Sequence, residues 1–391
     1  MEPLFWLLLP VAAFSGWLIG RRPLRGGGVR SSRDQDSLRG QYFQGLNYLL
    51  NEQPDKAIEV FTRMVEVDAD TAETHLALGN LFRRRGEVDR AIRIHQNLIA
   101  RPSLSREQRT YALLALGEDY LRAGLLDRAE NLFEEVVELN AHVELALGHL
   151  LDIYQQEKEW DRAVEAASRL EGRTGRRMAP MIAQFHCEQA EGAMASGELN
   201  RARGLLKRAL TVDPDCVRAS ILQGRLEQGA GNHKQALKAY QRVRYQDVEY
   251  LPEVLQPMGE CYQALGRRED FVAYLQSVQH EYDGASLVLI LAEQVRERDG
   301  DEGAIRFLTD QLARRPSVRG LNRLIELNLL AGPAPGGEEL RVLADLFSEL
   351  LREKPVYRCE QCGFTGRTLH WHCPSCRSWA SIKPIHGVEG E

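Results

Sequence analysis

The sequence predicts an all-α protein in which stacked helix pairs form a solenoid, with a single transmembrane helix before them and a small metal-binding module after them. Three observations support this prediction: an uncharged apolar run near the N-terminus, a helical pattern that recurs about every 34 residues, and four cysteines within 18 residues. The length of 391 residues is enough for several domains, and a hydrophobic content of 43% with 27% charged residues is enough for each to bury a core and stay soluble. The net charge of -6 argues against a protein built to coat nucleic acid.

The first element is an apolar segment, residues 4–20, that contains no charged side chain. Its length is near the lower limit for a helix that spans a bilayer, and Trp6 and Trp17 stand near its two ends. Because the neighbouring arginines all follow the segment, the positive-inside rule predicts that the rest of the chain is cytoplasmic. A cleaved signal peptide is the alternative, but the basic region that normally begins one is missing. We therefore expect a transmembrane anchor at 1–20 and a basic, flexible tether at 21–36.

The second element is a repeat that extends over residues 37–353. One signature is a large apolar residue followed by glycine and, three positions later, an aromatic residue, as in Leu78-Gly79 with Phe82. The other is an alanine followed four positions later by a bulky residue, and its copies begin at Ala57, Ala91, Ala129, Ala163, Ala202, Ala236 and Ala304. Turn glycines separate the two signatures, at Gly86, Gly124, Gly197, Gly231 and Gly266. The pattern resembles the tetratricopeptide repeat, and it predicts about eight helix pairs over 37–330 with a final helix at 338–353.

A solenoid of this kind predicts a protein-binding surface and no catalysis. The sequence contains no phosphate-binding glycine loop, nucleophile elbow or zinc-protease helix, so we expect that the protein is not an enzyme. The histidines and cysteines within the repeats are expected to pack or to face solvent: His75, His95, His149, His186, Cys187, Cys216 and Cys261. The run from Arg83 to Arg85 is expected to complement a helix dipole in solvent, with a binding patch as the alternative.

The third element is a module at 354–391 in which Cys359, Cys362, Cys373 and Cys376 form two C-x2-C pairs ten residues apart. Two residues between cysteines allow both sulfurs to face one ion, and two such pairs complete a tetrahedron. Gly363 supplies the backbone freedom that the first turn requires. The pairs resemble rubredoxin knuckles, although the gap is closer to that of a compact zinc ribbon. The expected metal is therefore Fe or Zn, and because four thiolates leave no open position for water, its role is structural or at most redox-active, not hydrolytic.

The order of these elements, and above all the segment from Tyr357 to Cys376 followed by Ile382-Lys383-Pro384-Ile385, resembles the lipopolysaccharide assembly protein B family. The resemblance implies an inner-membrane adaptor that presents the lipid A deacetylase (LpxC) to a membrane protease of the FtsH type. The four cysteines correspond to the metal ligands of the family. A scaffold that assembles lipopolysaccharide-synthesis enzymes without a protease remains the alternative. The terminal module lacks the basic stripe that nucleic-acid binding requires.

Overall fold

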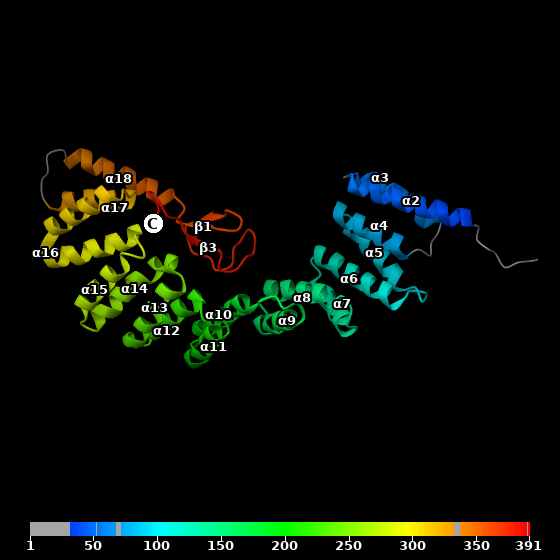
Figure 1. Ribbon diagram of the computed structural model, residues 1–391, viewed down its shortest axis with the longest axis horizontal. Helices are drawn as coiled ribbons and strands as arrows, with labels where there is room; N and C mark the ends of the chain where they lie inside the picture. The colour runs from blue at the N-terminus through cyan, green and yellow to red at the C-terminus, as the bar shows by residue number, and fades with distance from the viewer. Residues whose placement is uncertain (1–31, 52, 68–71, 332–336, 389) are drawn as a thin grey trace, which may run out of the picture. The chain divides into compact units, whose positions relative to one another are not determined.

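In the described residues from 32 to 353 the chain forms antiparallel helix pairs, and a three-stranded ribbon follows (Figure 1). The computed structural model describes residues 32–51, 53–67, 72–331, 337–388 and 390–391. These observations confirm the predicted all-α solenoid with a small terminal module. The predicted anchor at 1–20 lies outside the described residues, as does 21–31 of the predicted tether. Within the described residues, no helix has the length and apolar character needed to cross a membrane.

The chain divides into two compact units, Met1–Ala146 and Leu147–Glu391. The helices of the first unit are α2 (Ser32–Leu50), α3 (Pro54–Val67), α4 (Ala72–Arg85), α5 (Val88–Ile99), α6 (Arg106–Arg122), α7 (Leu126–Glu138) and the start of α8 (Val143–Glu157). Residues 32–36 of the predicted tether thus belong to α2.

The second unit holds the remaining helices and all three described strands. Its helices are α9 (Trp160–Thr174), α10 (Ala179–Ala195), α11 (Leu199–Val212), α12 (Val217–Gly229), α13 (His233–Gln246), η1 (Val248–Tyr250), α14 (Pro252–Ala264), α15 (Arg268–Val278), α16 (Ala285–Arg314), α17 (Val318–Leu330) and α18 (Gly337–Glu353). The predicted final helix is α18, and it packs on α17 as the second helix of a further pair.

Glycines with a left-handed backbone make the turns within the pairs. All five predicted turn glycines have positive φ, between 67° and 88°. A sixth turn glycine, Gly300, was not predicted, and its φ of 77° divides α16 into two helical segments, 285–299 and 301–314. Only glycine adopts this conformation at little cost, so each of these residues fixes the place where one helix ends and its partner begins.

Close contact between the paired helices depends on glycine facing a ring from the second helix. A Cβ atom at Gly117 would overlap the ring of Phe133, and one at Gly224 would overlap the ring of Tyr240. The same spacing of 16 residues joins Gly45 to Phe61 and Gly79 to His95. The two sequence signatures are therefore the two sides of one packing contact, and the rings involved are buried.

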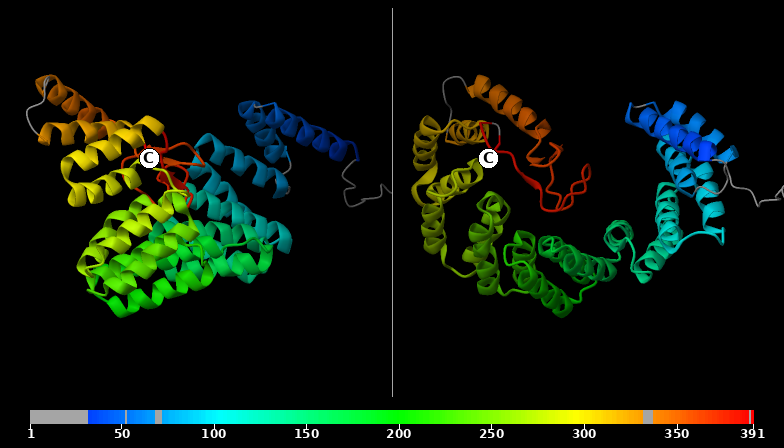
Figure 2. Two further views of the ribbon diagram at one scale, coloured as in Figure 1. Left: turned by 60° about the vertical axis from the view of Figure 1, so that its left-hand side comes forward. Right: turned by 45° about the vertical axis from the view of Figure 1, so that its right-hand side comes forward.

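The terminal ribbon consists of β1 (Tyr357–Cys359), β2 (Thr365–Gly366) and β3 (Ile382–Pro384) in the order β2-β1-β3. Both pairings are antiparallel, with Arg358 opposite Thr365 on one side and Lys383 on the other. Figure 2 shows the ribbon on the inner side of the curve formed by the helices of the second unit. The last strand therefore lies against helices that precede it by more than 100 residues.

Candidate metal centre and its seat on the repeats

Two turns of similar backbone shape present the cysteines of the ribbon. In the first, the amide of Gly363 donates to the carbonyl of Cys359 at 3.0 Å, and in the second the amide of Arg377 donates to the carbonyl of Cys373 at 2.9 Å. Gly363 and Arg377 both have positive φ, 77° and 58°. From the sequence, a positive φ was predictable only for the first turn, at Gly363, because an arginine such as Arg377 gives no signal for a left-handed conformation.

The two turns bring together all four cysteines of the predicted site. Their sulfurs lie within 4.8 Å of one another. The Sγ atoms of Cys359 and Cys376 are 3.7 Å apart, as are those of Cys362 and Cys373. Four thiolates at about 2.3 Å from a central ion would lie about 3.8 Å apart in a tetrahedron. The donor set and its spacing therefore fit one Fe or Zn ion.

The surroundings of Cys359 and Cys376 favour the thiolate form that a metal requires, whereas burial raises the pKa of the Cys373 thiol to about 11. Burial raises the pKa of the Cys359 thiol, but hydrogen bonds from the Ser381 hydroxyl and from the amides of Cys362 and Gln361 outweigh it and lower this pKa to about 6. Hydrogen bonds with the hydroxyl and amide of Ser378 lower the pKa of Cys376. Hydrogen bonds to an anion stabilise the anion, so the positions of Cys359 and Cys376 are the ones prepared to bind a cation.

The two histidines beside the second cysteine pair have other partners. The ring of His372 stacks on Trp379 with centroids 4.3 Å apart, and His370 Nε2 lies 3.1 Å from the hydroxyl of Thr368. In the described part of the chain, the candidate metal cluster contains cysteines alone.

Trp379 joins the ribbon to the beginning of the second unit. Its indole Nε1 donates to the side chain of Gln155 on α8 at 2.8 Å. Its ring packs edge-on against Trp160 of α9 and Phe185 of α10, with centroids 6.2 and 5.8 Å away. One side chain of the ribbon thus contacts three successive helices.

A second contact lies between the ribbon and η1. Trp371 stacks on Tyr250 with centroids 5.3 Å apart, and the Tyr250 hydroxyl donates to the carbonyl of Ile382 at 2.9 Å. Nζ of Lys383 lies 2.7 Å from a carboxylate oxygen of Glu249. The aromatic groups contribute buried apolar area and the polar groups fix the register.

The tail after β3 is held by α16 and α17. The side-chain carboxylate of Glu391 accepts hydrogen bonds from the amide and the hydroxyl of Ser286, at 2.9 and 2.6 Å, and forms an ion pair with Arg319. These groups nearly bury Glu391, which is 4% exposed. The contacts of this seat were not predictable from the sequence, since residues so distant along the chain leave no periodic signal.

The histidine, arginine and cysteine residues considered as functional candidates within the repeats make contacts that stabilise the fold. His95 is fully buried, with Nδ1 2.5 Å from a carboxylate oxygen of Asp119, and Arg83 binds the other oxygen at 2.7 Å. Arg83 therefore links two repeats, which corrects the expectation of a solvated end of a helix. Cys187, Cys216 and Cys261 occupy buried positions, as predicted.

Comparison with known proteins agrees with this architecture. Residues 357–384 match a family described as a rubredoxin metal binding domain, and 74–109, 114–176 and 187–247 match tetratricopeptide repeats. Among solved structures, Pseudomonas aeruginosa pilF is 17% identical with a TM-score of 0.33, covering 55% of this chain and 93% of that one. The family matches define the chain as a tetratricopeptide-repeat protein that carries a rubredoxin-type metal-binding domain.

Two relatives that match over their full length identify a particular family within this class of proteins. Lipopolysaccharide assembly protein B of Escherichia coli strain K12 is 44% identical over 392 residues, and the protein of that name from Haemophilus influenzae is 36% identical over 402 residues. Each match covers 100% of both chains. The chain belongs to the lipopolysaccharide assembly protein B family.

Proposed function

We propose that this protein regulates lipopolysaccharide synthesis as a membrane-tethered adaptor that delivers the lipid A deacetylase (LpxC) to a membrane protease of the FtsH type. The observation that carries the proposal is full-length identity of 44% to a protein named for lipopolysaccharide assembly. The repeats support it because stacked helix pairs offer extended surfaces for protein partners.

The metal centre contributes stability in this proposal. Cys359, Cys362, Cys373 and Cys376 would bind one Fe or Zn ion, and all four thiolates would be used, so that no position is left for a substrate. Around 30 residues of ribbon bury little apolar surface, so the ion would supply much of the folding free energy of this module. The ribbon would then brace the inner side of the second unit through Trp371 and Trp379.

The proposed membrane anchor is the segment at 1–20, which would place the remainder of the chain on the cytoplasmic side of the inner membrane. Holding an adaptor in the same membrane as the protease raises the effective concentration of a bound client without any new contact. A reporter that is active only in the cytoplasm, fused after Glu391, tests this orientation. An inactive reporter on a stable fusion would contradict it.

The decisive measurement is the half-life of the deacetylase after translation is stopped. Cells that lack the protein are compared with cells that carry the full chain, a chain without residues 1–20, or the Cys359→Ser variant. We expect the full chain to shorten the half-life, and both altered chains to shorten it less.

A scaffold that assembles lipopolysaccharide-synthesis enzymes without a protease is the second candidate. The word "assembly" in the name of the relatives favours it. An unchanged deacetylase half-life with and without the intact protein would reject the proteolytic adaptor in favour of this scaffold. Cross-linking in membranes, followed by mass spectrometry, would then identify synthesis enzymes and no protease.

A further inference from the structure

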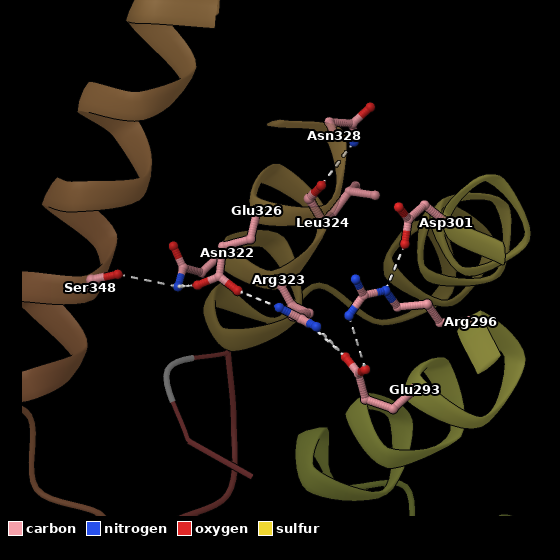
Figure 3. Close-up of polar contacts among 9 residues, drawn as sticks. All are labelled: Glu293, Arg296, Asp301, Asn322, Arg323, Leu324, Glu326, Asn328 and Ser348. Carbon is pink, nitrogen blue, oxygen red and sulfur yellow. Dashed lines mark hydrogen bonds and ion pairs between the residues drawn. The ribbon is translucent and has the colours of Figure 1, made fainter. Parts of the chain in front are cut away.

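The helix α18 has an apolar face that no described residue covers. Figure 3 shows how this helix is attached, with Ser348 turned toward Asn322 of α17 at 3.4 Å. Ala344, one turn before Ser348, is buried. The aliphatic side chains that stay open to solvent are Val342 (58% exposed), Leu343 (43%), Leu346 (55%) and Leu350 (54%).

Helical geometry places these side chains away from α17. Residues four apart lie almost above one another on a helix, so Val342, Leu346 and Leu350 form one stripe. At 100° per residue, this stripe is centred about 180° from the side of Ala344 and Ser348. The helix is therefore apolar on two sides, and only one of them is used by the fold.

Such a face is unusual for the last helix of a repeat array. Terminal helices normally present a polar outer surface, because no further repeat covers them. A continuous row of large aliphatic side chains on a surface helix is instead typical of a binding site.

The charged residues of α18 indicate what kind of partner its apolar stripe can bind. The helix carries five carboxylates against two guanidinium groups. Glu339 and Glu353 are exposed and flank the stripe on its own side of the helix. A second copy packed antiparallel about Leu346 would set these glutamates against each other, and an anionic lipid surface would repel them.

We propose that the outer face of α18 binds a basic amphipathic helix of a partner protein. The apolar side of the partner helix packs along Val342, Leu346 and Leu350, and lysines or arginines at its edges reach Glu339 and Glu353. Such recognition packs the apolar faces of two helices against each other, with anchors that recur every three or four residues. The site goes beyond the proposed adaptor role, because it is defined without reference to a protease or to the deacetylase.

Binding of a fluorescent 18-residue model helix made of leucine and lysine, followed by anisotropy on the full-length protein in detergent, tests the proposal. Wild type should bind this probe at least tenfold more tightly than the variant Leu346→Gln/Leu350→Gln. The matched control Leu145→Gln/Leu199→Gln changes leucines that are also exposed, at 56% and 40%, and should bind within twofold of wild type. Circular dichroism should be the same for all three proteins.

Two further probes separate the contributions of shape and charge. A leucine–lysine peptide of the same composition but scrambled order, and a leucine–glutamate helix with an intact stripe, should each bind wild type at least tenfold more weakly. Equal binding of the ordered leucine–lysine helix to wild type and to the variant Leu346→Gln/Leu350→Gln (the α18 variant) would overturn the proposal. So would sedimentation showing a wild-type dimer that the α18 variant converts to a monomer, because the stripe would then bind a second copy.

Discussion

At the scale of single residues, a glycine beside a buried ring sets how closely two helices of a repeat approach. The ring of Tyr240 is held in place because its hydroxyl donates to the side chain of Gln228 at 2.8 Å. A methyl group at Gly224 would overlap this ring, and the hydrogen bond prevents the ring from moving aside freely. Gly204, in the middle of α11, offers a matched contrast, because a Cβ atom added there would meet no neighbour within 4 Å.

We expect Gly224→Ala to lower the free energy of unfolding by about 1–3 kcal/mol, the usual cost of an overfilled core. Gly204→Ala should instead raise it by about 0.5–1 kcal/mol, because alanine is the better helix former where space is open. Urea unfolding followed by circular dichroism measures both. Stabilisation by both substitutions would show that the pairs do not need the close approach.

The cysteines allow a second test at this scale. Purified protein should contain about one Fe or Zn ion per chain, and Cys359→Ser should remove most of it. The loss of affinity should exceed the roughly 10- to 100-fold effect of removing a hydrogen-bond partner of a ligand, because a ligand itself is lost. Cys216→Ser, at a buried thiol of the repeats, should leave metal content unchanged. Elemental analysis measures both, and equal loss would mean that the metal lies elsewhere.

At the scale of elements, the ribbon and its seat depend on each other. Trp379 and Trp371 are its main apolar contacts with the helices, and each meets an aromatic residue of the second unit. The ribbon itself has short strands and a small core around Cys359, Cys373 and Ile382. Packing against the helices therefore supplements the stabilisation that the metal is proposed to give.

We expect Trp379→Ala to detach the ribbon from α8–α10 at a cost of up to about 3 kcal/mol. Limited proteolysis should then cut between α18 and β1 faster, while the metal stays bound. Trp379→Phe keeps much of the ring packing and loses the hydrogen bond to Gln155, so it should cost only about 1 kcal/mol. Unchanged proteolysis of Trp379→Ala would show that the seat contributes little.

Sequence periodicity was sufficient to predict the helix pairs, because the glycine and ring signatures recur in phase and each has a local cause. The clustering of the cysteines was likewise predictable from their spacing. The seat of the ribbon was not, since Gln155 and Trp379 stand 224 residues apart and no local pattern relates them. The buried contact of Arg83 was unpredictable for the same reason, because its partner Asp119 belongs to the next repeat.

At the scale of the whole molecule, the ribbon and the tail add long-range contacts to the second unit, and these affect how cooperatively it unfolds. Repeats in a solenoid normally contact only their neighbours, and their stability is nearly a sum over adjacent pairs. Here Trp379 reaches α8–α10, and Glu391 reaches α16 and α17. These contacts should make the second unit unfold with more cooperativity than a simple array.

The buried carboxylate of Glu391 should make the free energy of unfolding depend on pH. Burial raises the pKa of the Glu391 side chain, but Arg319 and Ser286 outweigh it and hold this pKa below the usual value of 4.5. A lowered pKa in the folded state stabilises the fold above that usual value, and the contribution is lost as the pH falls through the folded pKa. Glu391→Gln should therefore cost about 1–3 kcal/mol at neutral pH and progressively less below pH 4.5.

Urea unfolding of wild type and Glu391→Gln between pH 7 and pH 3 measures this dependence. Glu353→Gln, at an exposed carboxylate, serves as the control and should stay within about 0.5 kcal/mol of wild type. A cost for Glu391→Gln that does not change with pH would contradict the ionic role of the tail.

The distance in sequence between the ribbon and its seat also orders events during synthesis. At about 5–20 residues per second, the ribosome adds Trp379 some 10–45 s after Gln155. Once synthesised, Trp160, Phe185 and Tyr250 belong to a nascent chain whose inner surface stays uncovered until Trp379 has been added. Folding of the second unit is then completed only when the ribbon has emerged. A cell short of metal would accumulate full-length chains with these aromatic side chains still open to chaperones.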